Sequence, residues 1–222
     1  MKSLPLHVLD APTPTSAAQI PALLDAAELP FNAIDQAPWA NDFPYQPTVK
    51  FRIAATTEAL LLHYQVDEDY VAAAATADNG PVWEDSCCEF FCQPVADGTY
   101  YNIECNCMGT LLVGFGASRN SREWAPQPIL DGVLRWTSLA DKPGGTLPCR
   151  QSEGPWELAL VVPFATFFHH HVNLKDLKTL KVNFYKCGDK LPKPHFLAWN
   201  NIATPSPDFH RPDFLGYLIK SE

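Results

Sequence analysis

Charged residues and long apolar runs are the two features that this sequence has little of. Charged residues make up 18% of the 222 residues, below the usual quarter, and the formal net charge is -9. An acidic surface repels phosphate groups, so we expect no nucleic acid and no anionic membrane among its partners. No apolar run reaches the roughly 18 residues that a membrane-spanning helix requires, so we also expect no membrane span.

Zinc-binding spacings are missing from the seven cysteines. Cys87, Cys88 and Cys92 are close in sequence, but no second CxxC pair or paired histidine follows them at ligand spacing. We therefore predict reduced, mostly buried thiols, as in proteins of reducing compartments. The N-terminal segment 1–15 has no apolar core typical of a signal peptide. Together these observations favour a cytoplasmic location.

Proline is abundant instead, with 21 residues in the chain. Proline lacks the amide donor that a helix interior needs, so its abundance favours strands and fixed loops. Short segments of alternating or β-branched and aromatic residues, separated by turn residues, predict strands. They are Val49–Ala55, Ala59–Val66, Ser86–Cys92, Tyr100–Val113 broken at Gly109, Gly132–Ser138, Trp156–Val162, Leu180–Cys187 and Phe214–Ile219.

Many short strands and few helical periods predict an all-β protein with a sandwich or barrel architecture. Residues 1–45 are rich in proline and weakly patterned, so we expect an N-terminal extension packed on a domain of residues 46–222. Ala17–Ala27 predicts a short helix, as do Pro163–His170 and Leu174–Leu180, and residues 139–155 predict a surface loop.

Two tryptophans stand in polar, loop-like surroundings, unlike Trp136 and Trp156, whose strand patterns indicate the core. Trp83 precedes an acidic pair, and Trp199 lies between His195 and two asparagines. An indole ring edged by polar groups suits sugar recognition, because the apolar face of a pyranose stacks on the ring while its hydroxyls need donors and acceptors. The alternative is that these rings pin loops to the core.

The predicted strand around residues 100–107 has an apolar face and a polar face. Tyr101, Ile103, Cys105 and Cys107 alternate with the polar residues Asn102, Glu104 and Asn106. The polar face predicts either a solvated outer sheet surface or, beside Glu89, the lining of a concave binding site. Glu89 and Glu104 could also form the carboxylate pair of a glycosidase, although neither lies in a catalytic motif.

Three consecutive histidines, His169–His171, raise the question of a metal site. Consecutive residues do not converge on one ion, so a partly solvated element end is the favoured interpretation. The sequence contains no GxSxG, GxGxxG or P-loop pattern.

Four segments resemble the family 9 carbohydrate-binding modules, and in particular their stand-alone relatives in gut Bacteroides-type bacteria. They are Asn79–Phe91 (NGPVWEDSCCEFF), Tyr100–Leu112 (YYNIECNCMGTLL), Asn183–Trp199 (NFYKCGDKLPKPHFLAW) and Pro207–Gly216 (PDFHRPDFLG). The resemblance covers roughly residues 45–220. It implies an antiparallel β-sandwich of the kind shared with DOMON domains.

The resemblance also implies a sugar clamped between two tryptophans with polar groups around the rim. The clamp positions match Trp83 and Trp199, and Glu89 matches the acidic position of the same motif. Asn102, Glu104 and Arg119 match the polar partners loosely, and His195 adjoins the second clamp position. The family often holds structural calcium, for which Asp67, Glu68 and Asp69 are candidates, although no calcium loop signature is present.

We therefore expect non-catalytic binding of a mono- or oligosaccharide, in carbohydrate catabolism and without a cofactor. A glycoside hydrolase using Glu89 and Glu104 is the first alternative. A DOMON-like haem or protein-interaction domain is the second. Haem would need an axial ligand such as His63 or Met108 inside the sandwich.

Overall fold

Strands form most of the regular structure in the computed structural model, which describes residues 1–221. The strands are β1 (Ser3–Val8), β2 (Asn32–Ala33), β3 (Thr48–Ala55), β4 (Ala59–Asp67), β5 (Tyr70–Ala73), β6 (Cys87–Gln93), β7 (Tyr100–Asn106), β8 (Leu111–Ser118), β9 (Ser121–Trp124), β10 (Leu134–Thr137), β11 (Leu147–Gln151), β12 (Trp156–Pro163), β13 (Thr179–Cys187), β14 (Phe196–Ala198) and β15 (Gly216–Lys220). The helices are α1 (Ile20–Ala26), α2 (Gln127–Gly132) and the 3₁₀ turns η1 (Ala17–Gln19), η2 (Val82–Glu84), η3 (Phe164–Thr166) and η4 (Pro212–Phe214).

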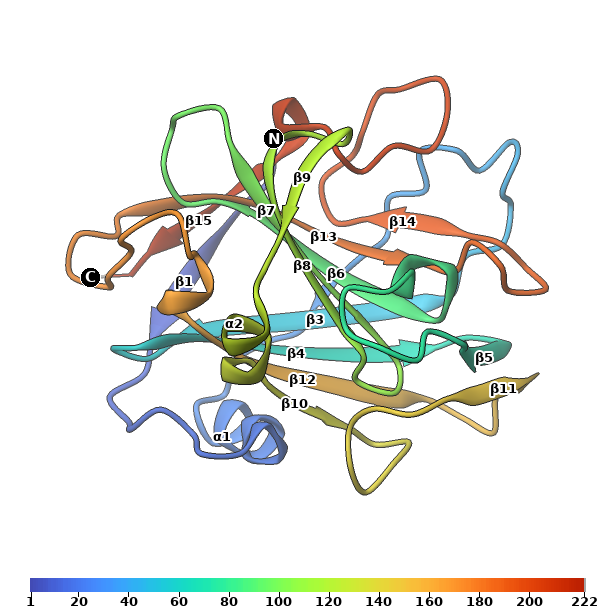
Figure 1. The fold of residues 1–222 in the computed structure, drawn as a ribbon, viewed down its shortest axis with the longest axis horizontal. Coiled ribbons are helices and arrows are strands. Elements are labelled where there is room, and N and C mark those ends of the chain that lie inside the picture. Colours follow the sequence, from blue (N-terminus) through green and yellow to red (C-terminus); the bar gives the residue numbers. More distant parts are fainter. Residues whose placement is uncertain (222) are drawn as a thin grey trace.

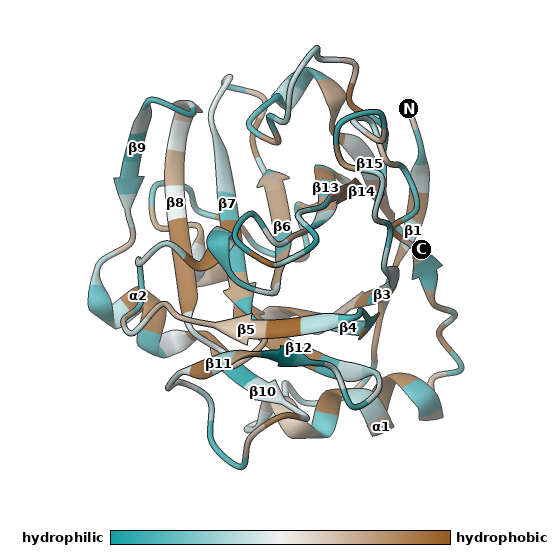
Figure 2. Ribbon diagram, turned by 90° about the vertical axis from the view of Figure 1, so that its right-hand side faces the viewer, coloured by the Kyte–Doolittle hydropathy of each residue, from teal (hydrophilic) through white to brown (hydrophobic). Residues whose placement is uncertain are grey.

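Two mainly antiparallel layers pack against each other (Figures 1 and 2). The first has the strand order β10-β12-β4-β3, and the second has the order β15-β13-β6-β7-β8-β9. Strand β1 joins them, because Ser3–Leu6 pair with β15 and His7–Val8 pair with β3. The predicted all-β sandwich is confirmed.

Alternation along the strands of the second layer divides its side chains between two faces. On β6, Cys88 and Phe90 belong to the core between the layers, while Cys87 and Phe91 belong to a separate cluster on the outer face. Glu89 lies between Cys87 and Phe91 in this alternation, so it shares the outer face. The outer face is therefore a second packed surface rather than a solvated one.

Chain segments from both ends cover this outer face. Trp39 packs edge-on against Phe196 at 6.2 Å and in a tilted arrangement against Phe209 at 5.8 Å. Its indole nitrogen donates to the carbonyl oxygen of Thr204 at 2.9 Å. These aromatic contacts hold the covering segments in place above the second layer.

The N-terminal segment contributes a strand to the sandwich. Strand β1 lies between β3 and β15, which the sequence analysis did not predict. The expected short helix is present as η1 and α1, and Ser16 with Gln19 forms a capping box at its start.

Three local expectations differ from the structure. The surface loop predicted over residues 139–155 contains β11, which pairs with β5. The helix predicted at Leu174–Leu180 was wrong. Asn173 instead closes a single turn by accepting a hydrogen bond from the backbone of Asp176 at 3.0 Å. The helix α2 was not predicted.

The cysteines follow the sequence prediction, since six of the seven are buried and Cys149 alone is exposed. None of the helices within residues 1–221 combines the length and apolarity needed to cross a bilayer.

Candidate functional site

A cavity of about 310 Å³ opens on the outer face of the second layer, and we call it the outer cavity. This volume is at the lower end of the range for small-molecule sites, so it suits one or two sugar-sized rings. The residues that line it are Trp83, Glu89, Asn102, Glu104, Leu112, Arg119, Arg122, Trp124, Cys187, Asp189, Phe196, Pro207, Asp208, Phe209 and His210.

Two carboxyl groups lie side by side in the floor of the cavity. Glu89 on β6 and Glu104 on β7 are direct partners in the antiparallel register, and each is 3% exposed. Asn102 donates to Glu104 Oε1 at 2.8 Å. The other carboxyl oxygen of Glu104 is buried and has no hydrogen-bond partner within residues 1–221. A buried carboxyl oxygen without a partner is uncommon in folded proteins.

Burial sets the protonation of these carboxyl groups. It raises the pKa of Glu89 well above the ordinary value, and the adjacent Glu104 charge raises it further. Burial also raises the pKa of Glu104 to about 7 and that of Asp189, at the cavity edge, to about 6. A neutral carboxyl can donate as well as accept, so the floor offers both kinds of hydrogen bond to a hydroxyl group.

Arg122 holds the other polar groups of the floor in position. Its guanidinium stacks on the Tyr100 ring at 4.3 Å and donates to the carbonyl oxygens of Gly116 and Tyr100 at 2.9 and 3.1 Å. It also donates to Asn102 Oδ1. Its buried Nε has no partner among the described residues. The floor thus combines an unpaired donor with an unpaired acceptor.

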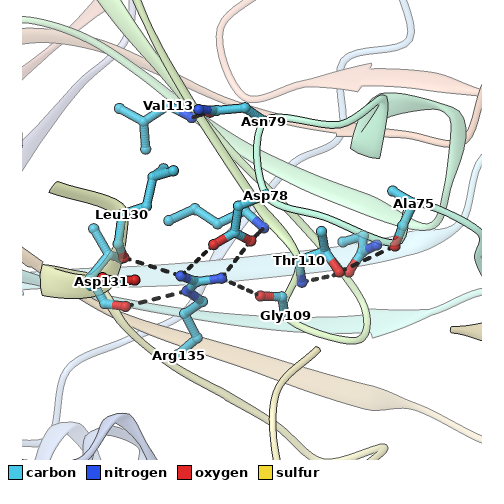
Figure 3. A network of polar contacts seen from close by, with 12 residues as sticks. Ala75, Asp78, Asn79, Gly109, Thr110, Val113, Leu130, Asp131 and Arg135 are labelled. Carbon is cyan, nitrogen blue, oxygen red and sulfur yellow. Dashed lines mark hydrogen bonds and ion pairs between the residues drawn. The ribbon is translucent and has the colours of Figure 1, made fainter. Parts of the chain in front are cut away.

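The loop before η2 positions Trp83, and polar contacts anchor this loop (Figure 3). The carboxylate of Asp78 accepts hydrogen bonds from both terminal nitrogens of Arg135, at 2.7 and 2.8 Å. Asn79, in the left-handed conformation at φ 59°, accepts from the backbone of Val113 at 3.2 Å and donates to Ala125 at 3.0 Å. These contacts fix the loop to β8 and to the segment after β9. The loop leads directly into η2, from which the indole of Trp83 lines the cavity.

Trp124, at the end of β9, supplies a second indole at the cavity and is 46% exposed. Large apolar side chains exposed beside a cavity are characteristic of binding surfaces. Phe196 on β14 is partly exposed and adds a third aromatic ring to the lining.

The rim carries charges of both signs. The exposed Arg119 lies 3.8 Å from Asp208. His210 has a pKa lowered to about 3 by burial and by the nearby Arg122 and Arg119, and its Nδ1 hydrogen-bonds the Tyr100 hydroxyl at 2.9 Å. A rim of mixed charge around an aromatic lining suits an uncharged polar ligand.

Five of the seven candidate residues from the sequence meet at this cavity. They are Trp83, Glu89, Asn102, Glu104 and Arg119. The solvated-face interpretation of the 100–107 strand was wrong, because Asn102 and Glu104 are almost fully buried. Asn106, also buried, instead donates to Asp85 at 2.9 Å and accepts from the turn at Met108 and Thr110.

Trp199 does not line the cavity, which corrects its expected role as a clamp. It is 3% exposed and packs edge-on against Phe51 and Phe184 in the core between the layers. Gly216 makes room for it, since a Cβ there would lie 2.5 Å from the indole. Trp199 is a structural residue.

His195 is also absent from the cavity. It is fully buried, and its Nε2 lies 2.8 Å from the ammonium of Lys186, while its Nδ1 donates to the carbonyl of Lys193. Lys186 in turn forms an ion pair with Glu68 at 2.8 Å. His195 therefore belongs to a buried polar network rather than to a ligand site.

The calcium candidates do not fit a calcium ion. Glu68 forms an ion pair with the Lys186 ammonium and accepts a hydrogen bond from Trp156 Nε1 at 2.9 Å. Asp69 forms an ion pair with Lys193. Two of the three carboxylates are therefore already paired with a lysine ammonium group, whereas calcium needs six to eight oxygen ligands.

The histidines considered for the haem and metal alternatives bond to protein groups. His63 uses both ring nitrogens, accepting from Arg52 at 3.1 Å and contacting Glu157 at 3.0 Å. His169 and His170 bond to different carboxylates, Glu123 and Asp97, each at 2.9 Å. Both ring nitrogens of His63 are therefore engaged, as are those of His170, whose Nδ1 also contacts the Tyr101 hydroxyl at 3.0 Å.

Sequence reasoning missed several lining residues, above all Trp124, Arg122, Asp189, Phe196, Asp208 and His210. The sequence did contain a signal for two of them. Arg122 and Trp124 are two residues apart in a short strand, and this spacing places both side chains on one face. The other residues come from loops, whose meeting point is a tertiary property.

Comparison with known proteins agrees with this geometry. The model of carbohydrate-binding family 9 matches residues 18–219. A Bacteroides uniformis crystal structure, described as a candidate carbohydrate-binding protein, is 47% identical over 99% of both chains, with a TM-score of 0.92. No protein with a curated description matches the chain.

Two structures of a family 9 module from Caldicellulosiruptor kristjanssonii share the fold at 10% identity and a TM-score of 0.62. One is in complex with glucose and the other with cellotriose. Each alignment covers 99% of this chain, and 96% and 93% of the respective module chains. The match over residues 18–219 and the 47% identical relative show that the chain belongs to carbohydrate-binding family 9.

Proposed function

We propose that this protein binds the end of a neutral mono- or oligosaccharide in the outer cavity, without chemical conversion. The observation that carries the proposal is a cavity lined by Trp83 and Trp124 whose floor holds an unpaired acceptor, on Glu104, and an unpaired donor, on Arg122. A pyranose presents both an apolar face and a ring of hydroxyls, and this combination complements those two features.

Each group has a distinct role in the proposed complex. The indoles of Trp83 and Trp124 stack on the apolar face of a sugar ring. Glu104 Oε2 accepts a hydroxyl proton and Arg122 Nε donates to a hydroxyl oxygen, which satisfies two buried groups that the protein leaves unpaired. Glu89 and Asp189 are the next partners in reach of the cavity.

The membership in carbohydrate-binding family 9 supports this proposal, as do the glucose and cellotriose complexes of the C. kristjanssonii module. The cavity volume of about 310 Å³ supports the end of a chain rather than a long internal segment.

Calorimetric titration with xylo-, cello- and manno-oligosaccharides tests the proposal. We expect one sugar class to bind, and we expect Trp83→Ala and Trp124→Ala each to weaken binding at least about tenfold, because each removes a buried aromatic contact. Trp136→Ala is the matched control, since Trp136 lies on β10 in the other layer. Binding that is unchanged in both cavity variants would discard the site.

A second candidate function, glycoside hydrolysis, rests on the direct cross-strand pairing of Glu89 with Glu104. Opposed residues on antiparallel strands have Cβ atoms about 4.5–5.5 Å apart, close to the carboxyl spacing of retaining glycosidases. However, a glycosidase pair flanks the scissile bond, whereas these two carboxyls lie side by side in the cavity floor. Turnover of an aryl glycoside that disappears in Glu89→Gln would favour this alternative over simple binding.

A further inference from the structure

Two thiols and a carboxyl group meet beside the outer cavity, where Cys187 and Glu89 belong to the lining and Cys87 is fully buried. Cys87 on β6 and Cys187 on β13 are direct partners in the antiparallel register, and Glu89 follows Cys87 by two residues on the same face. The two Sγ atoms and a Glu89 carboxyl oxygen all lie within 4.8 Å of one another. Three buried candidate ligand atoms thus lie close enough together to hold one metal ion.

We propose that Cys87, Glu89 and Cys187 form a binding site for a thiophilic divalent cation, best matched by Zn²⁺. The proposal concerns a different ligand from the sugar and does not depend on sugar binding, although Glu89 faces the same cavity.

The donor atoms select the class of metal. Two sulfurs and one carboxylate oxygen form a mixed set that suits zinc, which accepts sulfur, nitrogen and oxygen ligands. Calcium and magnesium prefer oxygen donors throughout, and Cu(I) prefers sulfur donors throughout. In a zinc tetrahedron, neighbouring ligand atoms lie about 3.5–3.8 Å apart. The Cys187 Sγ–Glu89 Oε1 separation is 3.0 Å, so these two groups need to part by less than an ångström.

Access distinguishes this cluster from the other buried thiols. Cys187 and Glu89 line the outer cavity, so two of the three ligands face a path from solvent. Three protein ligands leave a fourth position, as in zinc sites that also bind water or a ligand. By contrast, Cys92 and Cys105 face the core between the layers.

Burial opposes ionisation of the two thiols, because it raises the pKa of Cys87 to about 12 and that of Cys187 well above the ordinary thiol value. A bound cation must therefore displace the thiol protons, since a coordinating thiol is deprotonated.

The test uses the full chain carrying Cys149→Ser, which removes the one exposed thiol. Co²⁺ is the spectroscopic probe, because thiolate ligation gives a charge-transfer band that histidines such as His169–His171 do not give. Zn²⁺ affinity is measured by competition with a chelator. We expect one equivalent of Co²⁺ with a thiolate band, displaced by Zn²⁺.

Cys87→Ala should abolish the band and weaken Zn²⁺ binding by more than about 100-fold, since it removes a direct ligand. Cys92→Ala is the matched control, because Cys92 is equally buried on the same strand but faces the core, and it should bind as the parent does. Cys187→Ser is the second variant if Cys87→Ala fails to fold, with folding checked by circular dichroism.

A parent protein without a thiolate band, or a Cys87→Ala protein that keeps the parent Zn²⁺ affinity, would overturn the proposal. Sugar titration of the metal-free parent separates this outcome from the proposed function, because each ligand is then measured in the absence of the other.

Discussion

Gly114 on β8 lies directly opposite both Asn102 on β7 and Trp124 on β9, so the three residues form one row across the outer face. A Cβ atom on Gly114 would lie 2.5 Å from Asn102 Oδ1 and 2.9 Å from the Trp124 ring. The absence of a side chain at this position therefore lets the indole and the amide share one wall of the cavity.

Gly114→Ala should displace Trp124 or Asn102 and weaken sugar binding by about tenfold, because a sub-ångström shift of a binding group already reduces affinity. Calorimetry measures the effect. Gly132→Ala is the control, since a Cβ there meets no atom within 4 Å. Equal affinities for the two variants and the parent would show that the row is not part of the binding site.

Arg135→Lys should loosen the loop that carries Trp83. Lysine cannot make the two parallel hydrogen bonds that the Arg135 guanidinium donates to Asp78, so we expect the free energy of unfolding to fall by about 1–2 kcal/mol. We also expect sugar affinity to fall a few-fold. Urea unfolding and calorimetry measure the two effects.

The control for this substitution is Arg150→Lys, whose ion pair with Glu153 is exposed and should contribute little. If Arg135→Lys left both stability and affinity at the parent values, the anchoring role of the Asp78 contact would be refuted.

Trp199→Phe should reduce stability and leave the sugar affinity of the folded protein unchanged. The smaller ring leaves a void beside Phe51 and Phe184, so we expect a loss of about 2–3 kcal/mol in urea unfolding. Normal stability together with lost sugar binding would instead show that Trp199 contacts the ligand.

Acid should destabilise the protein through His195. Burial and the Lys186 charge lower the pKa of His195 to about 2, and Glu68 and the Tyr45 ring are its other polar neighbours. The unfolded chain takes up a proton near pH 6.5, whereas the folded protein does not. This stabilising contribution is therefore complete above pH 6.5 and is lost as the pH falls. The expected loss is about 2 kcal/mol between pH 6.5 and pH 5.

His195→Gln should flatten this part of the pH dependence, measured by urea unfolding at both pH values. His171→Gln, at an exposed position, should leave it as in the parent. An identical slope in His195→Gln and the parent would assign the acid sensitivity to other groups.

The periodicity of the sequence was sufficient to predict the sandwich and the polar strand face in the floor of the site. The period of two around residues 100–107 placed Asn102 and Glu104 on one face, and the structure places both in the cavity floor. The alternation could not show that this face is covered, because the covering residues Trp39 and Phe209 come from distant segments.

The error at Trp199 has a physical cause. Polar neighbours in sequence suggested an exposed ring, but Asn200 is itself buried and bonded to the backbone of Phe214 at 2.8 Å. The neighbours therefore serve the fold rather than a ligand. Likewise, no spacing rule could indicate the Cys87–Cys187 pair, because a hundred residues separate cysteines that only strand register brings together.

A crystal structure with the tightest-binding oligosaccharide tests the central claim most directly. We predict a terminal sugar ring in the outer cavity, in contact with Trp83 and Trp124, with one hydroxyl within hydrogen-bonding distance of Glu104 Oε2. Sugar bound at another surface while the outer cavity holds only solvent would contradict the account.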